Sequence, residues 1–319
     1  MRAALVAVLL AALPAAGRAQ SVDEICRSVA SIDLIERVEI ESKSAPCDAE
    51  ALLYGIGVPA DPAEARLCAA RQSAAGDDSP FRGKSLLMTI YANGRGAPRD
   101  LPRAIALACA IRGAPAEIEG RVRRLARYRD EGWTGSDFGI CQDGTSGLLQ
   151  GFCASHDSRM AGVKRDQAIA DLSRDWSRRR KASLARLRAA SDAYGSARAR
   201  HEVDLSGTAR GAIQVETSDE QADAFLTTLR ALLAGAPSSA ARSREVDAKL
   251  NATYRQVMAH GTEAWGTVDK DGIRRTQRAW LAYREAFARF ARTVSPRAAE
   301  RTGVGLTEDR IAILSEFVS

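Results

Sequence analysis

Histidines, cysteines and paired acids are the residues of this 319-residue chain whose side chains could carry out chemistry. His156 follows Cys153 by three residues. A cysteine attacks only as a thiolate, and a disulfide-bonded cysteine has none. Asp77 and Asp78 are adjacent carboxylates in a stretch rich in Gly, Ser and Pro. A solvated turn explains that pair better than acid–base catalysis does.

Known catalytic motifs are missing from the sequence. It contains no Gly-x-Ser-x-Gly elbow, no His-Glu-x-x-His pair, no phosphate-binding loop and no Rossmann glycine pattern. We therefore predict that the protein is not an enzyme and works by binding. A hydrolase stays an alternative only if the fold brings acidic residues together in a cleft.

The six cysteines all lie between residues 26 and 153. They are Cys26, Cys47, Cys68, Cys109, Cys141 and Cys153. An even number of cysteines in an exported chain is typical of disulfides, because that compartment is oxidising. A metal site would show a Cys-x-x-Cys pair or clustered histidines, and the sequence has neither. We expect no metal and no cofactor.

The N-terminal residues have the pattern of a cleavable secretory signal, which we assign to residues 1–19. Arg2 supplies positive charge, an apolar run extends from Ala3 to Leu13, and small residues flank Arg18. That run is shorter than the roughly 20 apolar residues that span a bilayer. A retained hydrophobic helix is the alternative. We predict a periplasmic or secreted protein with no membrane span.

The chain is basic, with a formal net charge of +6, and its positive charge is concentrated between Arg159 and Arg200. A polyanion-binding surface and a solvated helix face both fit that run. Acidic residues are interleaved and aromatic residues are few, which favours the solvated face. We expect no nucleic-acid partner.

Helical periodicity recurs along the chain and predicts an all-α fold. In the first part, two stretches repeat a pattern in which Gly is followed by Asp and then by Ala at intervals of four. Asp61 and Asp100 are its capping residues, 39 residues apart. Glycine ends one helix, and Asp with a following Pro begins the next. The pattern resembles the Sel-type repeat, a relative of the tetratricopeptide repeat, over residues 45–115, which implies an interaction surface.

Cysteine pairing in this repeat region is open, because four cysteines allow three pairings. Cys68 and Cys109 fall on the second helices of adjacent hairpins, so a disulfide between them is one hypothesis. The pairing of Cys26 and Cys47 is left open with it.

Apolar stripes in the second part predict a helical bundle. Ile273, Trp280, Phe287 and Val294 recur every seven residues. Tyr283 and Phe290 lie between them on the same face. Further stripes comprise Leu250, Tyr254 and Val257, and then Phe225, Leu229 and Leu232.

Three motifs in order resemble the LprI-like family of lysozyme inhibitors, from Cys141 to the C-terminus. The motifs are the pair Cys141 and Cys153, then Asp247-x-x-Leu250-Asn251-x-x-Tyr254, then Gln277-x-x-Trp280-x-x-Tyr283-Arg284-Glu285. A closing stretch from Leu306 through Arg310 to Leu314 also resembles the family. The resemblance implies an exported helical domain, a Cys141–Cys153 disulfide, and binding of lysozyme or another cell-wall hydrolase.

The sequence departs from the family pattern in two ways. Roughly 90 residues separate the cysteine pair from the later motifs. Phe287 and Phe290 also stand where family members often carry a cysteine. We predict a signal at 1–19, repeats at 20–135 and an LprI-like domain at 136–319. That last domain is either one interrupted bundle or two units, 136–205 and 206–319.

Roles for the motif residues follow from burial tendencies. Trp280 is expected to be a core anchor, with an inhibitory wedge as the alternative. Asn251 and Gln277 are expected to hydrogen-bond across the bundle. The basic face from Arg174 to Arg188 is a candidate contact for an acidic cleft. The predicted function is inhibition or modulation of a cell-wall hydrolase. A repeat scaffold without inhibitory activity is the alternative, and the oligomeric state is not predicted.

Overall fold

The computed structural model describes residues 20–35, 47–235, 240–294 and 296–318. These residues form an all-helical fold with no strand among them, which confirms the predicted class. The assigned signal segment, residues 1–19, lies outside the described residues. No helix in the described ranges is long and apolar enough to cross a membrane.

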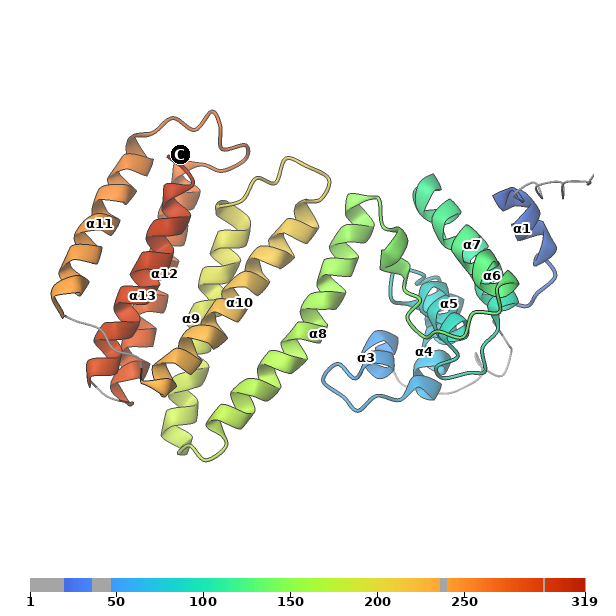
Figure 1. The fold of residues 1–319 in the computed structure, drawn as a ribbon, viewed down its shortest axis with the longest axis horizontal. Coiled ribbons are helices and arrows are strands. Elements are labelled where there is room, and N and C mark those ends of the chain that lie inside the picture. The colour runs from blue at the N-terminus through green and yellow to red at the C-terminus, as the bar shows by residue number, and fades with distance from the viewer. Residues whose placement is uncertain (1–19, 36–46, 236–239, 295, 319) are drawn as a thin grey trace, which may run out of the picture.

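The N-terminal group of helices is built from short hairpins (Figure 1). Its elements are α1 (Val22–Ser28), α3 (Ala49–Tyr54), α4 (Pro62–Ala74), α5 (Gly83–Asn93), α6 (Leu101–Ala110) and α7 (Pro115–Asp130). The helices α3 to α7 pack in order, each against the next, as antiparallel neighbours joined by short loops do. The helix α1 lies against α6 and α7.

The C-terminal group consists of longer helices (Figure 1). After the 3₁₀ turn η1 (Ile140–Asp143) come α8 (Gly147–Ser173), α9 (Arg178–His201), α10 (Arg210–Ala234), α11 (Ala240–Ala259), α12 (Lys270–Arg292) and α13 (Pro296–Ser315). The central helix α12 packs against α9 and α13, and α10 packs against α8 and α9.

Capping in both hairpins agrees with the sequence pattern. The Asp61 carboxylate accepts a hydrogen bond from the Glu64 amide at 3.0 Å, and Asp100 accepts one from the Arg103 amide at 2.9 Å. The glycines that end the preceding helices are Gly55 and Gly94, whose backbones are in the left-handed conformation. Each lies two residues before the glycine of the sequence pattern, Gly57 or Gly96. Gly96 is needed for stacking, because a Cβ there would lie 2.2 Å from the Pro62 carbonyl oxygen.

Three disulfides join the described cysteines. They are Cys26–Cys109, Cys47–Cys68 and Cys141–Cys153. The hypothesis that Cys68 pairs with Cys109 is wrong. The fully buried Cys68 of α4 is bonded to the segment before α3, whereas Cys109 on α6 is bonded to α1. Three disulfides are consistent with a periplasmic or extracellular protein.

Removing the Cys26–Cys109 disulfide is expected to destabilise the fold more than removing Cys141–Cys153. The first closes 83 residues and the second 12. In the chain-entropy model the longer loop restricts the unfolded chain more, with a typical effect of about 2–5 kcal/mol. Thermal unfolding of the two double serine variants measures this. Equal losses of melting temperature would contradict it.

Two hydrophobic cores occupy the two groups of helices, and α8 connects them. The first core runs from Ile25 to Leu149, so η1 and the first turn of α8 pack with the repeats. The second core contains buried residues of α9 through α13, and Ile169 and Leu172 near the end of α8 pack against it. The helix α9 therefore belongs to the same core as α12, although a division into units 136–205 and 206–319 would separate the two helices.

Candidate functional site: a groove between α11 and α12

The motif residues of α11 lie along one stripe of that helix. Asp247, Leu250, Asn251 and Tyr254 follow the spacing i, i+3, i+4 and i+7, which places all four on one helix face. Leu250 is buried, whereas Asn251 is exposed. This face therefore offers an apolar base with a polar edge.

The motif residues of α12 divide between the core and the surface. Trp280 and Tyr283 are each 1% exposed and lie in the core. Gln277 and Arg284 turn towards α11, together with Arg278 and Leu281. Buried residues of α12 recur about once per helical turn. The residues between them therefore lie on the other faces of the helix and point away from the core.

These two faces line a hollow of about 500 Å³, which we call the α11–α12 groove. Its lining residues are Asp247, Leu250, Asn251, Tyr254, Arg274, Gln277, Arg278, Leu281 and Arg284. The helix α13 packs against both α11 and α12. The two helices are thereby held side by side by a third, which leaves the space between their outer faces open.

One ion pair spans the groove. The Arg284 guanidinium lies 2.7 Å from the Asp247 carboxylate, and it also stacks over the Trp280 ring at 5.4 Å. The pair therefore links the two LprI-like motifs, one on each helix, to the buried tryptophan beneath them.

A buried charge network supports the groove from below. Arg310 of α13 is fully buried and donates two hydrogen bonds of 2.6 Å to Glu202, the C-cap residue directly after α9. Its Nε donates to the Gln277 side chain at 2.8 Å. The predicted bond across the bundle is therefore present for Gln277. Asn251 lies exposed in the groove and makes no such bond to any of the residues that the structure describes.

Burial and pairing act against each other at Arg310. Burial alone lowers the pKa of Arg310, but hydrogen bonds and charge from Glu202 outweigh it, so the net pKa is raised. Arg310 therefore stays charged and paired. Burial also raises the pKa of Tyr283, which keeps that phenol protonated within the core.

Glu202 is a functional residue that the sequence alone does not reveal. Arg310 stands in the closing motif, but its partner lies 108 residues earlier at the end of a basic helix. One glutamate at the end of a helix carries no periodic or motif signal that would have identified it.

The groove surface combines positive charge with an exposed apolar side chain. Its lining contains three arginines and one aspartate, a formal charge of +2. Arg274 forms an ion pair with exposed Asp271. The apolar side chain of the groove is Leu281, which is 48% exposed. Isolated exposed leucines are ordinary. Arginine is enriched at protein–protein interfaces, and here it stands beside an exposed apolar side chain in a concave surface.

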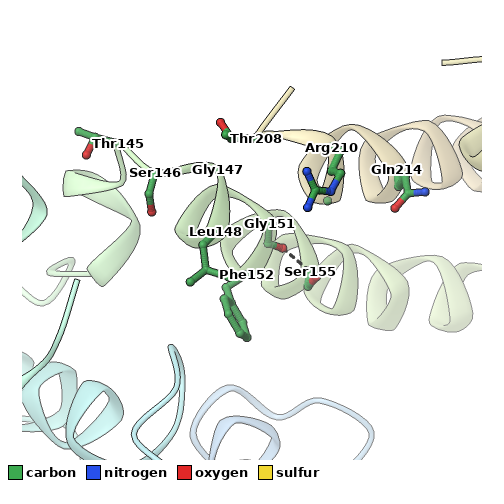
Figure 2. A pocket seen from close by; sticks show the side chains of 11 residues that line it. Thr145, Ser146, Gly147, Leu148, Gly151, Phe152, Ser155, Thr208, Arg210 and Gln214 are labelled. Atoms are coloured by element: carbon green, nitrogen blue, oxygen red, sulfur yellow. Dashed lines mark hydrogen bonds between the residues drawn. The ribbon is translucent and has the colours of Figure 1, made fainter. Parts of the chain in front are cut away.

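A second hollow of about 750 Å³ lies between the N-terminal ends of α8 and α10 (Figure 2). Leu148 on α8 is 73% exposed there, and Arg210 and Gln214 line the α10 side. None of the residues of the Asp247 and Gln277 motifs lies in this hollow. It therefore serves as the reference surface for tests of the α11–α12 groove.

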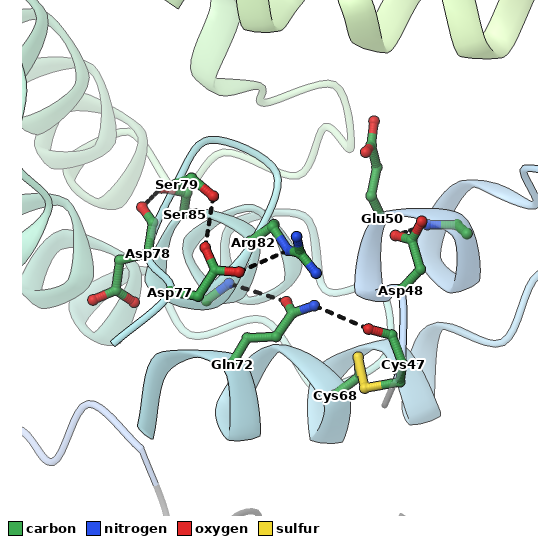
Figure 3. Close-up of polar contacts among 12 residues, drawn as sticks. Cys47, Asp48, Glu50, Cys68, Gln72, Asp77, Asp78, Ser79, Arg82 and Ser85 are labelled. Carbon is green, nitrogen blue, oxygen red and sulfur yellow. Dashed lines mark hydrogen bonds and ion pairs between the residues drawn. A yellow bond between two sulfur atoms is a disulfide. The ribbon is translucent and has the colours of Figure 1, made fainter. Parts of the chain in front are cut away.

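His156 and Asp77, which the sequence singled out as residues able to carry out chemistry, have structural contacts. His156 Nδ1 lies 2.7 Å from Glu50 Oε1, and its ring stacks on Phe81 at 4.1 Å, so it joins α8 to the repeats. The Ser79 hydroxyl donates a hydrogen bond of 2.7 Å to the Asp77 carboxylate within the loop before α5 (Figure 3). Within the described residues, no three potential ligands gather as a metal site.

The basic face between Arg174 and Arg188 is partly neutralised within the fold. Arg174 pairs with Asp171 and Arg188 pairs with Asp166, each at 2.6 Å. Arg180 lies 3.9 Å above the Trp176 ring. These contacts favour the solvated face, and a role for this surface in binding stays a prediction.

Residues 236–314 match the family model described as "Lysozyme inhibitor LprI". The match covers α11 to α13 and every residue of the α11–α12 groove. The C-terminal part of the chain is therefore similar to LprI, whereas the Sel-type repeats are not shown by this comparison. No curated protein and no solved structure gives a significant match to the chain.

Proposed function

We propose that this protein is an exported, non-catalytic binding protein that inhibits or modulates a lysozyme-type cell-wall hydrolase. The α11–α12 groove is the contact surface. The single observation that carries the proposal is that the segment similar to LprI contains the groove, whose two walls carry the Asp247 and Gln277 motifs on separate helices.

Two further features support a role in an oxidising compartment. The signal-like segment at residues 1–19 fits export, and the three disulfides fit the conditions met after export. The repeats serve as a disulfide-stabilised base from which α8 extends to the bundle.

Turnover of cell walls by a lysozyme in the presence of the purified mature protein tests the proposal. We expect inhibition at micromolar concentration. The variants Leu281→Ser and Arg278→Glu should each raise the concentration for half inhibition about tenfold or more, because both remove central contacts. Unchanged turnover with the unmodified protein would contradict the proposal.

Matched controls exist on the same molecule. Leu148→Ser removes a still more exposed leucine, 73% against 48% for Leu281, from the α8–α10 hollow. Arg275→Glu makes the same charge change as Arg278→Glu on α12, outside the groove. Both should inhibit like the unmodified protein. If the controls lost as much inhibition as the groove variants, the effect would not be specific to the groove, and the proposed contact surface would be wrong.

A second candidate function is a repeat scaffold without inhibitory activity. The separate hydrophobic core of the N-terminal hairpins favours it, since stacked hairpins commonly present protein-binding surfaces. Capture of a partner by the full chain, abolished by changes within residues 45–115 and retained by Arg278→Glu, would support this candidate over the first.

A further inference from the structure

We infer that the α8–α10 hollow is a second binding site, and that it takes an acidic saccharide. None of the residues that line this hollow belongs to the α11–α12 groove. The inference therefore does not depend on inhibition of lysozyme. It rests on the proposed function only in the choice of a cell-wall glycan as the saccharide to be tested.

The hollow has the size of a small-ligand site and a fixed shape. Its volume is about 750 Å³, within the roughly 300–1,000 Å³ that ligand pockets occupy. Part of its lining is glycine backbone, and a Cβ at Gly147 would lie 2.0 Å from the Thr208 carbonyl oxygen. The start of α8 thus packs on the loop before α10 through backbone atoms, which do not move aside as flexible side chains do. The hollow is therefore built into the fold.

Leu148 and Phe152 give the hollow an apolar surface. They stand four residues apart on α8, and their side chains lie next to each other (Figure 2). Leu148 is 73% exposed, more than any other large apolar side chain that the structure describes, and Phe152 is half-buried. A ligand that covers this surface with an apolar group is favoured, because hydrocarbon is removed from water.

Polar side chains that the fold leaves uncommitted surround the apolar surface. They are Thr145, Thr208, Arg210 and Gln214. None of these four side chains forms a hydrogen bond or an ion pair with any residue that the structure describes. Hydroxyls and an amide both donate and accept, whereas the guanidinium only donates. The lining contains one cation, Arg210, and no carboxylate.

This combination selects a saccharide over a lipid. A sugar ring has apolar C–H groups on its faces and hydroxyl groups around its edge. One face can cover Leu148 and Phe152 while the hydroxyls bond the threonines and Gln214. An acyl chain would instead cover those polar side chains without bonding them, which is unfavourable.

Arg210 selects an acidic saccharide over a neutral one. Its guanidinium is a planar fork of donors that matches a carboxylate in two parallel hydrogen bonds. With no carboxylate in the lining to neutralise it, the side chain suits one carboxylate on the ligand. N-acetylmuramic acid, a sugar of bacterial cell walls, has this chemistry because it is an amino sugar with one carboxylate substituent.

Calorimetry with two disaccharides tests the site on the full-length mature protein. The acidic probe is N-acetylglucosaminyl-N-acetylmuramic acid, and the neutral probe is N,N′-diacetylchitobiose. We expect the acidic probe to bind about tenfold more tightly than the neutral one, as the loss of one charge-assisted contact implies. Arg210→Gln should remove that difference by weakening only the acidic probe. Leu148→Ser should weaken both probes by the same factor.

Controls on the same chain show whether the effect belongs to the hollow. Arg230→Gln makes the same change at an exposed arginine of α10 outside the hollow, and Arg278→Glu alters the α11–α12 groove. Both should bind the two disaccharides like the unmodified protein. Thermal unfolding should be the same for Arg210→Gln and the unmodified protein, because Arg210 is exposed. Decanoate is the lipid probe and should not bind.

The outcomes separate this site from the proposed function. The inference is overturned if neither disaccharide binds, if Arg210→Gln weakens both probes equally, or if decanoate binds in their place. Saccharide binding by a protein that does not inhibit lysozyme would support the hollow and contradict only the proposed function. Inhibition without saccharide binding would do the reverse.

Discussion

Replacing Arg310 by methionine is expected to lower the free energy of unfolding by about 3–5 kcal/mol. The change leaves Glu202, whose side chain is 1% exposed, as a buried charge without its partner. It also removes the donor to Gln277 and the contact with the Tyr194 hydroxyl at 3.5 Å. Desolvating an unpaired carboxylate costs far more than the packing lost by this substitution.

Denaturant unfolding monitored by circular dichroism measures that loss. The double variant Glu202→Leu/Arg310→Met is the informative control, because replacing both members of a buried pair with apolar residues is often close to neutral. We expect it to recover most of the stability. A single variant that loses under 1 kcal/mol, or a double variant worse than the single, would contradict the account of this pair.

Replacing Trp280 by alanine is expected to cost about 3–5 kcal/mol. The indole is 1% exposed and belongs to the second hydrophobic core, so its removal leaves a cavity there that the surrounding side chains fill only in part. Arg284 would also lose the ring beneath it, and its pair with Asp247 across the groove would be less constrained.

The same substitution distinguishes a core anchor from an inhibitory wedge. Trp280→Phe keeps most of the buried area and should keep both stability and binding. If the tryptophan instead contacted the partner, Trp280→Phe would weaken lysozyme inhibition while leaving the denaturation midpoint unchanged. Parallel unfolding and inhibition assays on the two variants give the answer.

Local features of the fold could be predicted well from the sequence. Capping by Asp61 and Asp100 depends on neighbouring residues alone, and both caps are present. The seven-residue stripe on α12 is likewise a local pattern. Its members Ile273, Phe287 and Phe290 are fully buried.

Features that depend on distant residues could not be predicted. The disulfide partners follow from how α1 lies against α6, which no spacing encodes. The pairing of Arg310 with Glu202 depends on α9 and α13 meeting in one core. Distant contacts of this kind leave no period or motif in the chain.

The sequence predicts which residues belong to the candidate site but not how they are arranged. A motif does not say which of its members face the core. Trp280 and Tyr283 turn inward, while Asn251 turns outward, contrary to the expected bond across the bundle. The groove also depends on Arg278 and Leu281, which stand between the motif positions and carry no signal of their own.

Hydroxyl-radical footprinting of the protein with and without bound lysozyme is the most direct test of the central claim, that binding occurs in the α11–α12 groove. Leu281 and Tyr254 should become protected in the complex, and Leu148 in the α8–α10 hollow should react equally in both states. Protection of Leu148 or of the repeat helices, with Leu281 still reactive, would contradict the claim.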